Sequence, residues 1–257
     1  MTWTFYKYQG TGNDFVMIDN RNQLFPHDNL AIIDSMCNRH FGIGADGIIL
    51  IENDAAADFK MRYFNADGSE TFCGNGARCA VAFARFLKII DCKATFNACD
   101  GSHYAEIENN QVSLQMIDVD DVTITENAVF LYTGTEHHVE LVSQLDGYPV
   151  YENGKKIRNS YNAPGSNVNF VQKLNEETFR VRTYEKGVEA ETLACGTGVT
   201  AVAIAMHKTK QTTSRSLSLP VEGGVLEVSF DVANSHYSNV CLKGSAQFVF
   251  KGSIDLS

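Results

Sequence analysis

The chain has 257 residues, 44% of them hydrophobic, and a formal net charge of -10 at pH 7. This length allows one large domain or two smaller ones, and the hydrophobic content is enough for a full globular core. The acidic balance argues against nucleic acid and anionic membranes as partners, because both carry negative charge themselves.

The N-terminus and the cysteines indicate the compartment. Residues 1–7 have the pattern of a strand and lack the basic start and apolar run of a signal peptide. No apolar stretch reaches the length of a membrane span, so we expect a cytoplasmic protein. The seven cysteines are an odd number and form no Cys-x-x-Cys pair. We therefore expect neither a disulfide framework nor a metal site.

Hydrophobic periodicity predicts the elements in chain order. The first half is expected to hold strands over 4–8 and 15–19, a helix over 29–38, strands over 48–51 and 59–64, and a helix over 77–87. Short strands are expected over 105–107, 112–116, 122–125, 139–142, 166–172 and 178–183. Gly and Pro predict a loop over 154–165. A helix over 199–206 and several strands between 216 and 250 complete the chain.

An internal repeat organises these elements. The first copy reads Arg62-Tyr63-Phe64, Glu70-Thr71, Cys73-Gly74-Asn75-Gly76, and the second reads Arg182-Thr183-Tyr184, Glu191-Thr192, Cys195-Gly196-Thr197-Gly198. An Ala-rich helix follows each copy. A weaker echo precedes them, Gly12-Asn13-Asp14-Phe15-Val16 in one half and Ser166-Asn167-Val168-Asn169-Phe170-Val171 in the other.

The repeat predicts an α/β (α+β) fold of two pseudo-symmetric lobes. Each lobe is expected to be a mixed, mostly antiparallel sheet around a central helix, with the active site in the cleft between the lobes. The N-terminal lobe would span 1–116, completed by the C-terminal strand 245–257, and the C-terminal lobe would span 117–244.

The two Cys-Gly-x-Gly turns suggest chemistry. Glycine lets backbone N–H groups approach a ligand, and the first N–H groups of a helix attract a carboxylate and favour a thiolate. Two thiols on opposite faces of one carbon suit stereoinversion, in which one removes the α-proton and the other returns a proton. No motif suggests pyridoxal phosphate, so no cofactor is expected. Cys79, inside the helix, is expected to be core.

Five motifs in the right order make the chain resemble the diaminopimelate epimerase family over most of its length. They are Gly10-Thr11-Gly12-Asn13-Asp14-Phe15, Phe41-Gly42-Ile43-Gly44-Ala45-Asp46-Gly47, Phe64-Asn65-Ala66-Asp67-Gly68-Ser69-Glu70, Cys73-Gly74-Asn75-Gly76-Ala77-Arg78-Cys79 and Glu191-Thr192-Leu193-Ala194-Cys195-Gly196-Thr197-Gly198. The resemblance implies a cofactor-independent isomerase that interconverts LL- and meso-diaminopimelate, a small-molecule substrate on the route to lysine and peptidoglycan. A homodimer is one assembly that it allows.

The resemblance also implies roles for particular residues. Cys73 and Cys195 would be the acid/base pair, with His137 and Glu185 assisting the thiols and binding the reacting amine. Other residues would bind substrate: Asn13, Asn65, Asn167 and Lys186 at the distal end, and Gly74, Asn75, Gly196 and Thr197 at the reacting carboxylate. Asparagine also favours turns, which is the ordinary explanation for the three asparagines.

The sequence departs from the family pattern in three places. Lys186 stands where the family has Arg, Glu136 stands where it has Pro, and two residues instead of three separate Glu70 from Cys73. Because Lys offers a point charge where Arg offers a planar fork, the first departure bears on substrate choice. Two alternatives therefore stay open: a racemase or epimerase of a different amino acid on the same fold, and a catalytically silent amino-acid-binding protein.

Overall fold

The computed structural model describes residues 2–255 and divides the chain into two compact units. The first unit contains the residues up to 114 together with those from 244 onward, and the second contains residues 115–243. Both units combine sheet and helix, so the predicted α+β class with two lobes is confirmed. The assignment of lobe boundaries and of a site between the lobes stays a prediction.

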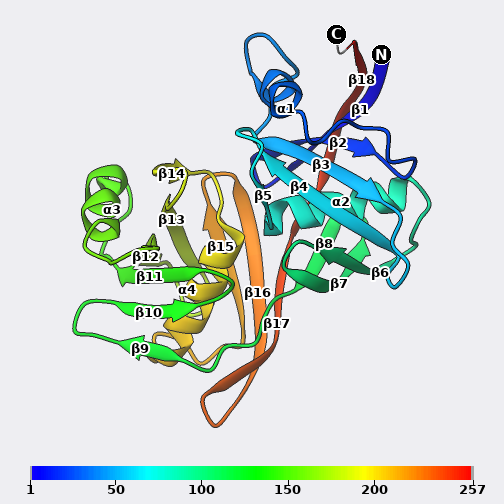
Figure 1. The fold of residues 1–257 in the computed structure, drawn as a ribbon. Coiled ribbons are helices and arrows are strands. Elements are labelled where there is room, and N and C mark those ends of the chain that lie inside the picture. Colours follow the sequence, from blue (N-terminus) through cyan, green and yellow to red (C-terminus); the bar gives the residue numbers. More distant parts are fainter. Residues whose placement is uncertain (1, 256–257) are drawn as a thin grey trace. The chain divides into compact units, whose positions relative to one another are not determined.

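The first unit is a mixed, mostly antiparallel sheet with two helices (Figure 1). Its strands follow the order β8-β7-β6-β4-β3-β2-β1-β18, with β5 beside β4. Its elements are β1 (Thr2–Gly10), β2 (Asn13–Asp19), α1 (Leu30–Cys37), β3 (Gly47–Glu52), β4 (Phe59–Asn65), β5 (Glu70–Thr71), α2 (Gly74–Phe86), β6 (Lys93–Ala98), β7 (Gly101–Glu108), β8 (Gln111–Gln115) and β18 (Gln247–Asp255). Pairs β2–β3 and β4–β6 are parallel, and the other pairs are antiparallel.

The second unit has a sheet in the order β14-β13-β12-β11-β10-β9 and a meander of β15, β16 and β17. Its elements are β9 (Val122–Ile124), β10 (Val129–Tyr132), β11 (Glu136–Leu141), α3 (Val150–Arg158), β12 (Asn167–Lys173), β13 (Phe179–Glu185), β14 (Ala190–Thr192), α4 (Gly196–Lys208), β15 (Ser216–Val221), β16 (Gly224–Ala233) and β17 (His236–Ser245). The pair β11–β12 is parallel.

One helix is buried at the centre of each unit. In α4 the consecutive residues 198–206 are all buried, and α2 is buried over 74–81. Both stretches are buried on every side, as is typical of a helix inside a core. Within their own units, α2 packs on β1, β2, β3 and β4, and α4 packs on β10, β11, β12 and β16. This arrangement confirms the predicted central helices.

The predicted loop over 154–165 is wrong in its first part, because α3 runs through Arg158. Because Gly154 lowers helix propensity, the sequence around it did not predict a helix. Its role is close packing: a Cβ at Gly154 would lie 2.4 Å from Cβ of the buried Tyr184. The helix can approach β13 only because this residue has no side chain.

The strand order also shows that the weaker sequence echo, between the segments around Asn13 and Asn167, does not join equivalent strands. In the first unit the strands before the central helix run β2, β3, β4, β5 with pairings parallel, antiparallel and antiparallel. In the second unit β11, β12, β13, β14 show the same three pairings. The counterpart of β2 is therefore β11, and β12 corresponds to β3. Asn13 begins β2 and Asn167 begins β12, so the two asparagines do not occupy equivalent positions in the two units.

Candidate functional site

Both repeat cysteines stand at the N-cap of a buried central helix. The backbone of Cys73 has φ -135° and ψ 117°, and that of Cys195 has φ -121° and ψ 110°. The first helical hydrogen bonds return to these two residues, from Ala77 to Cys73 and from Val199 to Cys195. The N–H groups between each Cys and the first helical donor thus precede the intrahelical ladder. Gly74, Asn75, Gly196 and Thr197 provide four of these groups.

A matching ion pair precedes each cysteine. Arg62 on β4 donates through Nε and Nη2 to both carboxylate oxygens of Glu70 on β5, at 2.9 and 2.7 Å. Arg182 on β13 makes the same fork with Glu191 on β14, at 2.6 and 2.7 Å. Bidentate pairs of this kind fix orientation as well as distance. The repeated Arg and Glu therefore set the course of the strand that leads to each Cys.

The second glycine of each turn is required by packing. A Cβ at Gly198 would lie 2.5 Å from Oδ1 of Asn169 and 3.2 Å from Sγ of Cys195. A Cβ at Gly76 would lie 2.9 Å from Cδ1 of Ile49. Each helix thus begins close against the strand beneath it, which explains the Cys-Gly-x-Gly spacing in physical terms.

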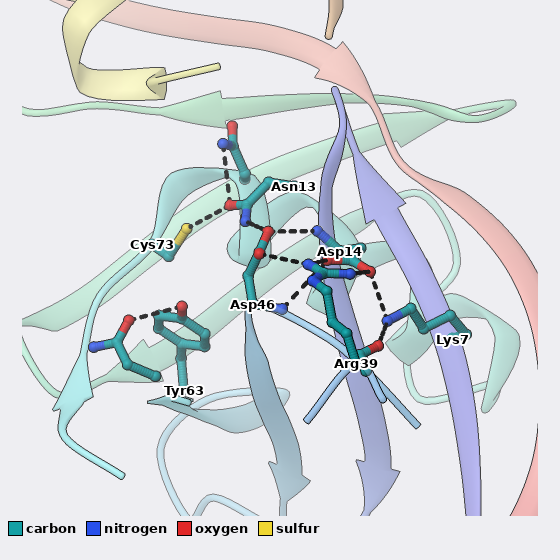
Figure 2. A network of polar contacts seen from close by, with 10 residues as sticks. Lys7, Asn13, Asp14, Arg39, Asp46, Tyr63 and Cys73 are labelled. Atoms are coloured by element: carbon teal, nitrogen blue, oxygen red, sulfur yellow. Dashed lines mark hydrogen bonds and ion pairs between the residues drawn. The ribbon is translucent and has the colours of Figure 1, made fainter. Parts of the chain in front are cut away.

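In the first unit, Cys73 belongs to a polar network with Asn13 (Figure 2). The thiol of Cys73 donates to Oδ1 of Asn13 at 3.5 Å, and Nδ2 of Asn75 donates to the same oxygen at 3.3 Å. Nδ2 of Asn13 donates to the carboxylate of Asp46. Asn65 lies apart from this network: its Nδ2 donates to Ser69 in the turn that follows β4 and to Thr71 on β5, and the Tyr63 hydroxyl donates to its Oδ1.

Charged residues surround the far side of Asn13. Arg39 forks onto Asp14 at 2.7 and 3.1 Å and also reaches Asp46 at 2.8 Å, while Lys7 pairs with Asp14 at 2.7 Å. Burial alone would raise the pKa of Asp14, but hydrogen bonds from Arg39 and Lys7 lower that pKa to about 2. The Asp14 carboxylate, near the start of β2, therefore stays ionised. Sequence reasoning missed Asp46 and Arg39, although both lie in or beside a quoted motif.

In the second unit, Cys195 and Thr197 share a contact of 3.5 Å between Sγ and Oγ1. The backbone carbonyl of Thr197 accepts a 2.8 Å hydrogen bond from the Thr133 hydroxyl. Glu185 ends β13, and its carboxylate accepts from the Thr192 hydroxyl at 2.9 Å. Thr192 belongs to the strand that leads to Cys195, so Glu185 is tied to the same turn.

His137 is fully buried beside Asn169. Burial, with the Lys186 charge, lowers the pKa of His137 to about 3, so the ring is neutral at pH 7. Nδ2 of Asn169 donates to the His138 carbonyl at 3.0 Å and lies 3.1 Å from Nδ1 of His137. Because a carbonyl only accepts, the amide orientation is fixed and Nδ1 is the acceptor. The ring hydrogen is therefore on Nε2, which has no hydrogen-bond partner among the described residues.

Lys186 and Asn167 meet where β13 ends and β12 begins. The Lys186 backbone N–H donates to Oδ1 of Asn167 at 2.8 Å, and Nζ of Lys186 pairs with the Glu136 carboxylate at 2.5 Å. Although burial would raise the pKa of Glu136, the hydrogen bond from Lys186 keeps that pKa below its usual range. Lys186 and Glu136, the two residues that depart from the family pattern, thus neutralise each other's charge.

Neither a metal centre nor a membrane segment emerges from the described chain. Within residues 2–255, no group of three or more His, Cys, Asp and Glu side chains is placed to hold a metal ion. No helix in the same range combines the length and apolar character needed to cross a bilayer.

Comparison with known proteins gives a consistent result. A family model described as diaminopimelate epimerase matches residues 5–122 and 129–249. A diaminopimelate epimerase of Flavobacterium psychrophilum is 56% identical over 253 residues, covering 97% of this chain and 99% of the relative. The diaminopimelate epimerase of Aquifex aeolicus is 38% identical, with 96% of each chain covered.

Solved structures share the fold at low sequence identity. A PhzF-family phenazine biosynthesis protein of Bacillus anthracis superposes with a TM-score of 0.79 at 15% identity, with all of both chains covered. A hydroxyproline epimerase from Agrobacterium vitis superposes with a TM-score of 0.69 at 15% identity, covering 98% of this chain and 92% of the other.

Proposed function

The chain belongs to the diaminopimelate epimerase family, and from this premise we propose that it inverts one α-carbon of diaminopimelate by proton transfer between Cys73 and Cys195. The observation that carries the proposal is the duplicated turn. Two thiols occupy equivalent N-cap positions, and a bidentate Arg–Glu ion pair precedes each of them in the chain. The family membership supports the isomerase class and the substrate. The geometry supports the choice of thiols.

The proposed reaction uses one proton shared between two sulfurs. One sulfur, as thiolate, takes the α-hydrogen and becomes a thiol, which leaves a carbanion stabilised by the neighbouring carboxylate. The opposing thiol delivers its hydrogen to the other face and becomes the thiolate. The C–H bond broken and the C–H bond formed balance, so no oxidant or reductant is needed. The product leaves the two sulfurs in exchanged protonation states, ready for the reverse direction.

The helix starts support binding of the reacting carboxylate. Gly74 and Asn75 begin α2, and Gly196 and Thr197 begin α4, so their N–H groups carry the positive end of each helix dipole. Negative charge that develops on the carboxylate in the carbanion would be stabilised by these fixed donors. Packing accounts for Gly76 and Gly198, so it is the first glycine of each turn, Gly74 or Gly196, that would let a carboxylate approach the backbone N–H groups.

The remaining groups divide between the two ends of the substrate. Because His137 carries its hydrogen on Nε2 and is neutral, it would donate to a substrate oxygen and would not remove a proton. Glu185 would then accept from the substrate ammonium. Asn13, Asn167 and Lys186 would hold the distal end. Asn65 has the weakest support, since its side chain is engaged within its own turn.

The test is a chiral separation of diaminopimelate after incubation with the purified protein. LL- and meso-forms should interconvert, and Cys73→Ala and Cys195→Ala should each abolish the reaction while Cys79→Ala does not. A panel of amino acids with one carboxylate addresses the alternative substrate. Turnover of a panel member without turnover of diaminopimelate would contradict the proposed substrate, and binding without α-hydrogen exchange would indicate a silent binding protein.

Assembly and location complete the proposal. Exposed apolar side chains gather at β18 and the end of α2, namely Phe248, Val249, Phe250 and Phe86. A strand edge with such side chains is suited to pairing with a second copy, so we propose a homodimer. Light scattering after gel filtration tests the homodimer, and Val249→Lys is expected to give a monomer.

The seven free cysteines suit the reducing cytoplasm, so we propose a cytoplasmic location. Cell fractionation tests this location.

A further inference from the structure

Arg78 lies on α2, fully buried, five residues after Cys73. Its Nη2 donates to the Thr11 hydroxyl at 2.9 Å and to Oδ1 of Asn75 at 3.0 Å. A guanidinium has donors only, so the Asn75 amide must present its oxygen to Arg78. Its Nδ2 then points the other way, toward Oδ1 of Asn13.

Asp46 fixes the opposite end of this chain of amides. An ionised carboxylate only accepts, so Asn13 must present Nδ2 to Asp46 and Oδ1 to Asn75 and Cys73. The hydrogen bonds therefore run in one direction, from the guanidinium through two amides to the carboxylate. The orientation of Asn13 follows from the charges at both ends of the chain.

The N-terminus of α2 favours a thiolate at Cys73, and the direction of the amide relay opposes that effect. Oδ1 of Asn13 accepts the thiol hydrogen, and the same oxygen would repel a thiolate at that distance. We propose that Asp46 and Arg78 are positioning residues that polarise this amide relay, so that Cys73 keeps its proton in the ligand-free protein. The inference rests on the proposed function, because it assigns the acid of the first half-reaction to Cys73.

Other charged and titratable groups near Cys73 in the first unit support the same assignment. Cys79 is a buried neutral thiol, since burial raises its pKa to about 12. Asp14, Arg39 and Lys7 balance each other beyond Asn13. The Arg78 charge favours a thiolate, but only its Nη2 donates, to Thr11 and Asn75, and its Nε and Nη1 have no hydrogen-bond partner among the described residues. The Asn13 oxygen, in contrast, is in direct contact with the sulfur.

Site-resolved alkylation tests the relay. Wild type, Asp46→Asn and Asn13→Asp would be treated with iodoacetamide from pH 6 to pH 10, and alkylation of Cys73 and Cys195 would be followed by peptide mass spectrometry. In Asp46→Asn the new side chain carries an NH2 donor where the carboxylate had only acceptors, so it no longer fixes the orientation of the Asn13 amide. Alkylation of Cys73 should become roughly two- to tenfold faster at pH 7, which corresponds to about 0.4–1.4 kcal/mol.

Asn13→Asp should change the rate in the opposite direction. A carboxylate beside the sulfur stabilises the protonated thiol relative to the thiolate. Cys73 should therefore be alkylated more slowly, and the pH at which alkylation is half-maximal should rise. General loosening of the fold would instead speed alkylation in both variants. Asp19→Asn is the matched control: it removes the carboxylate that forks with Arg21 at the other end of β2 and should change neither cysteine.

The outcomes separate the relay from the proposed function. Unchanged Cys73 alkylation in a folded Asp46→Asn variant, with wild-type epimerisation intact, would overturn the relay and leave the function standing. Opposite shifts in the two variants together with a wild type that does not epimerise diaminopimelate would support the relay and contradict the function. Thermal melting by circular dichroism confirms that each variant is folded.

Discussion

Replacing Glu136 by Gln removes the carboxylate that holds the Lys186 ammonium in the ligand-free protein. The two side chains are 29% and 20% exposed, so the pair is neither fully solvated nor fully buried. Two charges about 4 Å apart interact by about 4 kcal/mol at an effective dielectric constant near 20, before the costs of desolvation and ordering. After those costs we expect a coupling energy of about 1 kcal/mol.

The same change should strengthen substrate binding. In the proposed complex Lys186 must leave Glu136, or share it, before it can pair with the distal carboxylate. Removing the competitor should therefore lower the Michaelis constant for diaminopimelate by about fivefold, the equivalent of about 1 kcal/mol. The turnover number should change little, because neither residue contacts the thiols among the hydrogen bonds and ion pairs of the described chain.

The assay combines steady-state kinetics with urea unfolding in a double-mutant cycle of Glu136→Gln and Lys186→Met. Lys186→Met should raise the Michaelis constant whether or not Glu136 is present. Glu176→Gln is the control, since Glu176 pairs with Lys173 on the surface at 2.9 Å. A Michaelis constant that rises in Glu136→Gln, or a coupling energy no larger than that of the surface pair, would refute the competition between Glu136 and substrate.

Three further predictions follow from burial and packing. Cys79→Ala should keep full activity and lose about 1 kcal/mol of unfolding free energy in urea, because it removes one small buried group. Gly198→Ala should lower the turnover number by at least about tenfold in the epimerisation assay, because its Cβ would lie 2.5 Å from Oδ1 of Asn169 and force the start of α4 to move. Below its ordinary pKa of 6.5, His137 takes up a proton in the unfolded chain but stays neutral in the folded protein down to a pKa of about 3. The free energy of unfolding should therefore decrease as the pH falls from 6.5 to about 3, by up to about 1.4 kcal/mol per pH unit. His137→Gln should make this dependence on pH shallower in urea melts. An unchanged dependence in the variant would contradict the neutral state of His137.

The repeat made much of the fold predictable. Two copies of the Arg, Glu, Cys-Gly-x-Gly series predicted two helix starts, and the structure places Cys73 and Cys195 at those starts with nearly the same backbone angles. The Arg62–Glu70 and Arg182–Glu191 forks explain why those letters repeat. Local sequence carries such features because the interacting residues lie within ten positions of each other.

Long-range packing accounts for what sequence reasoning missed. Gly154 argued against a helix, yet its missing side chain is what lets α3 reach Tyr184. The direction of the amide relay depends on Asp46 and Arg78, which are 32 positions apart in the sequence. No local pattern states which way an amide faces, because that choice is made by the donors and acceptors that folding brings around it.

Deuterium content at the α-carbon, measured at low conversion in D2O, tests the two-thiol reaction most directly. Starting from either the LL- or the meso-form, the product should carry one deuterium at the inverted carbon while the remaining substrate carries none, because the donor thiol has exchanged with solvent and the acceptor thiol has not returned its hydrogen. Product that keeps its original hydrogen, or substrate that gains deuterium as fast as product forms, would show that a single group moves the proton and would contradict the assignment of Cys73 and Cys195 as opposing partners.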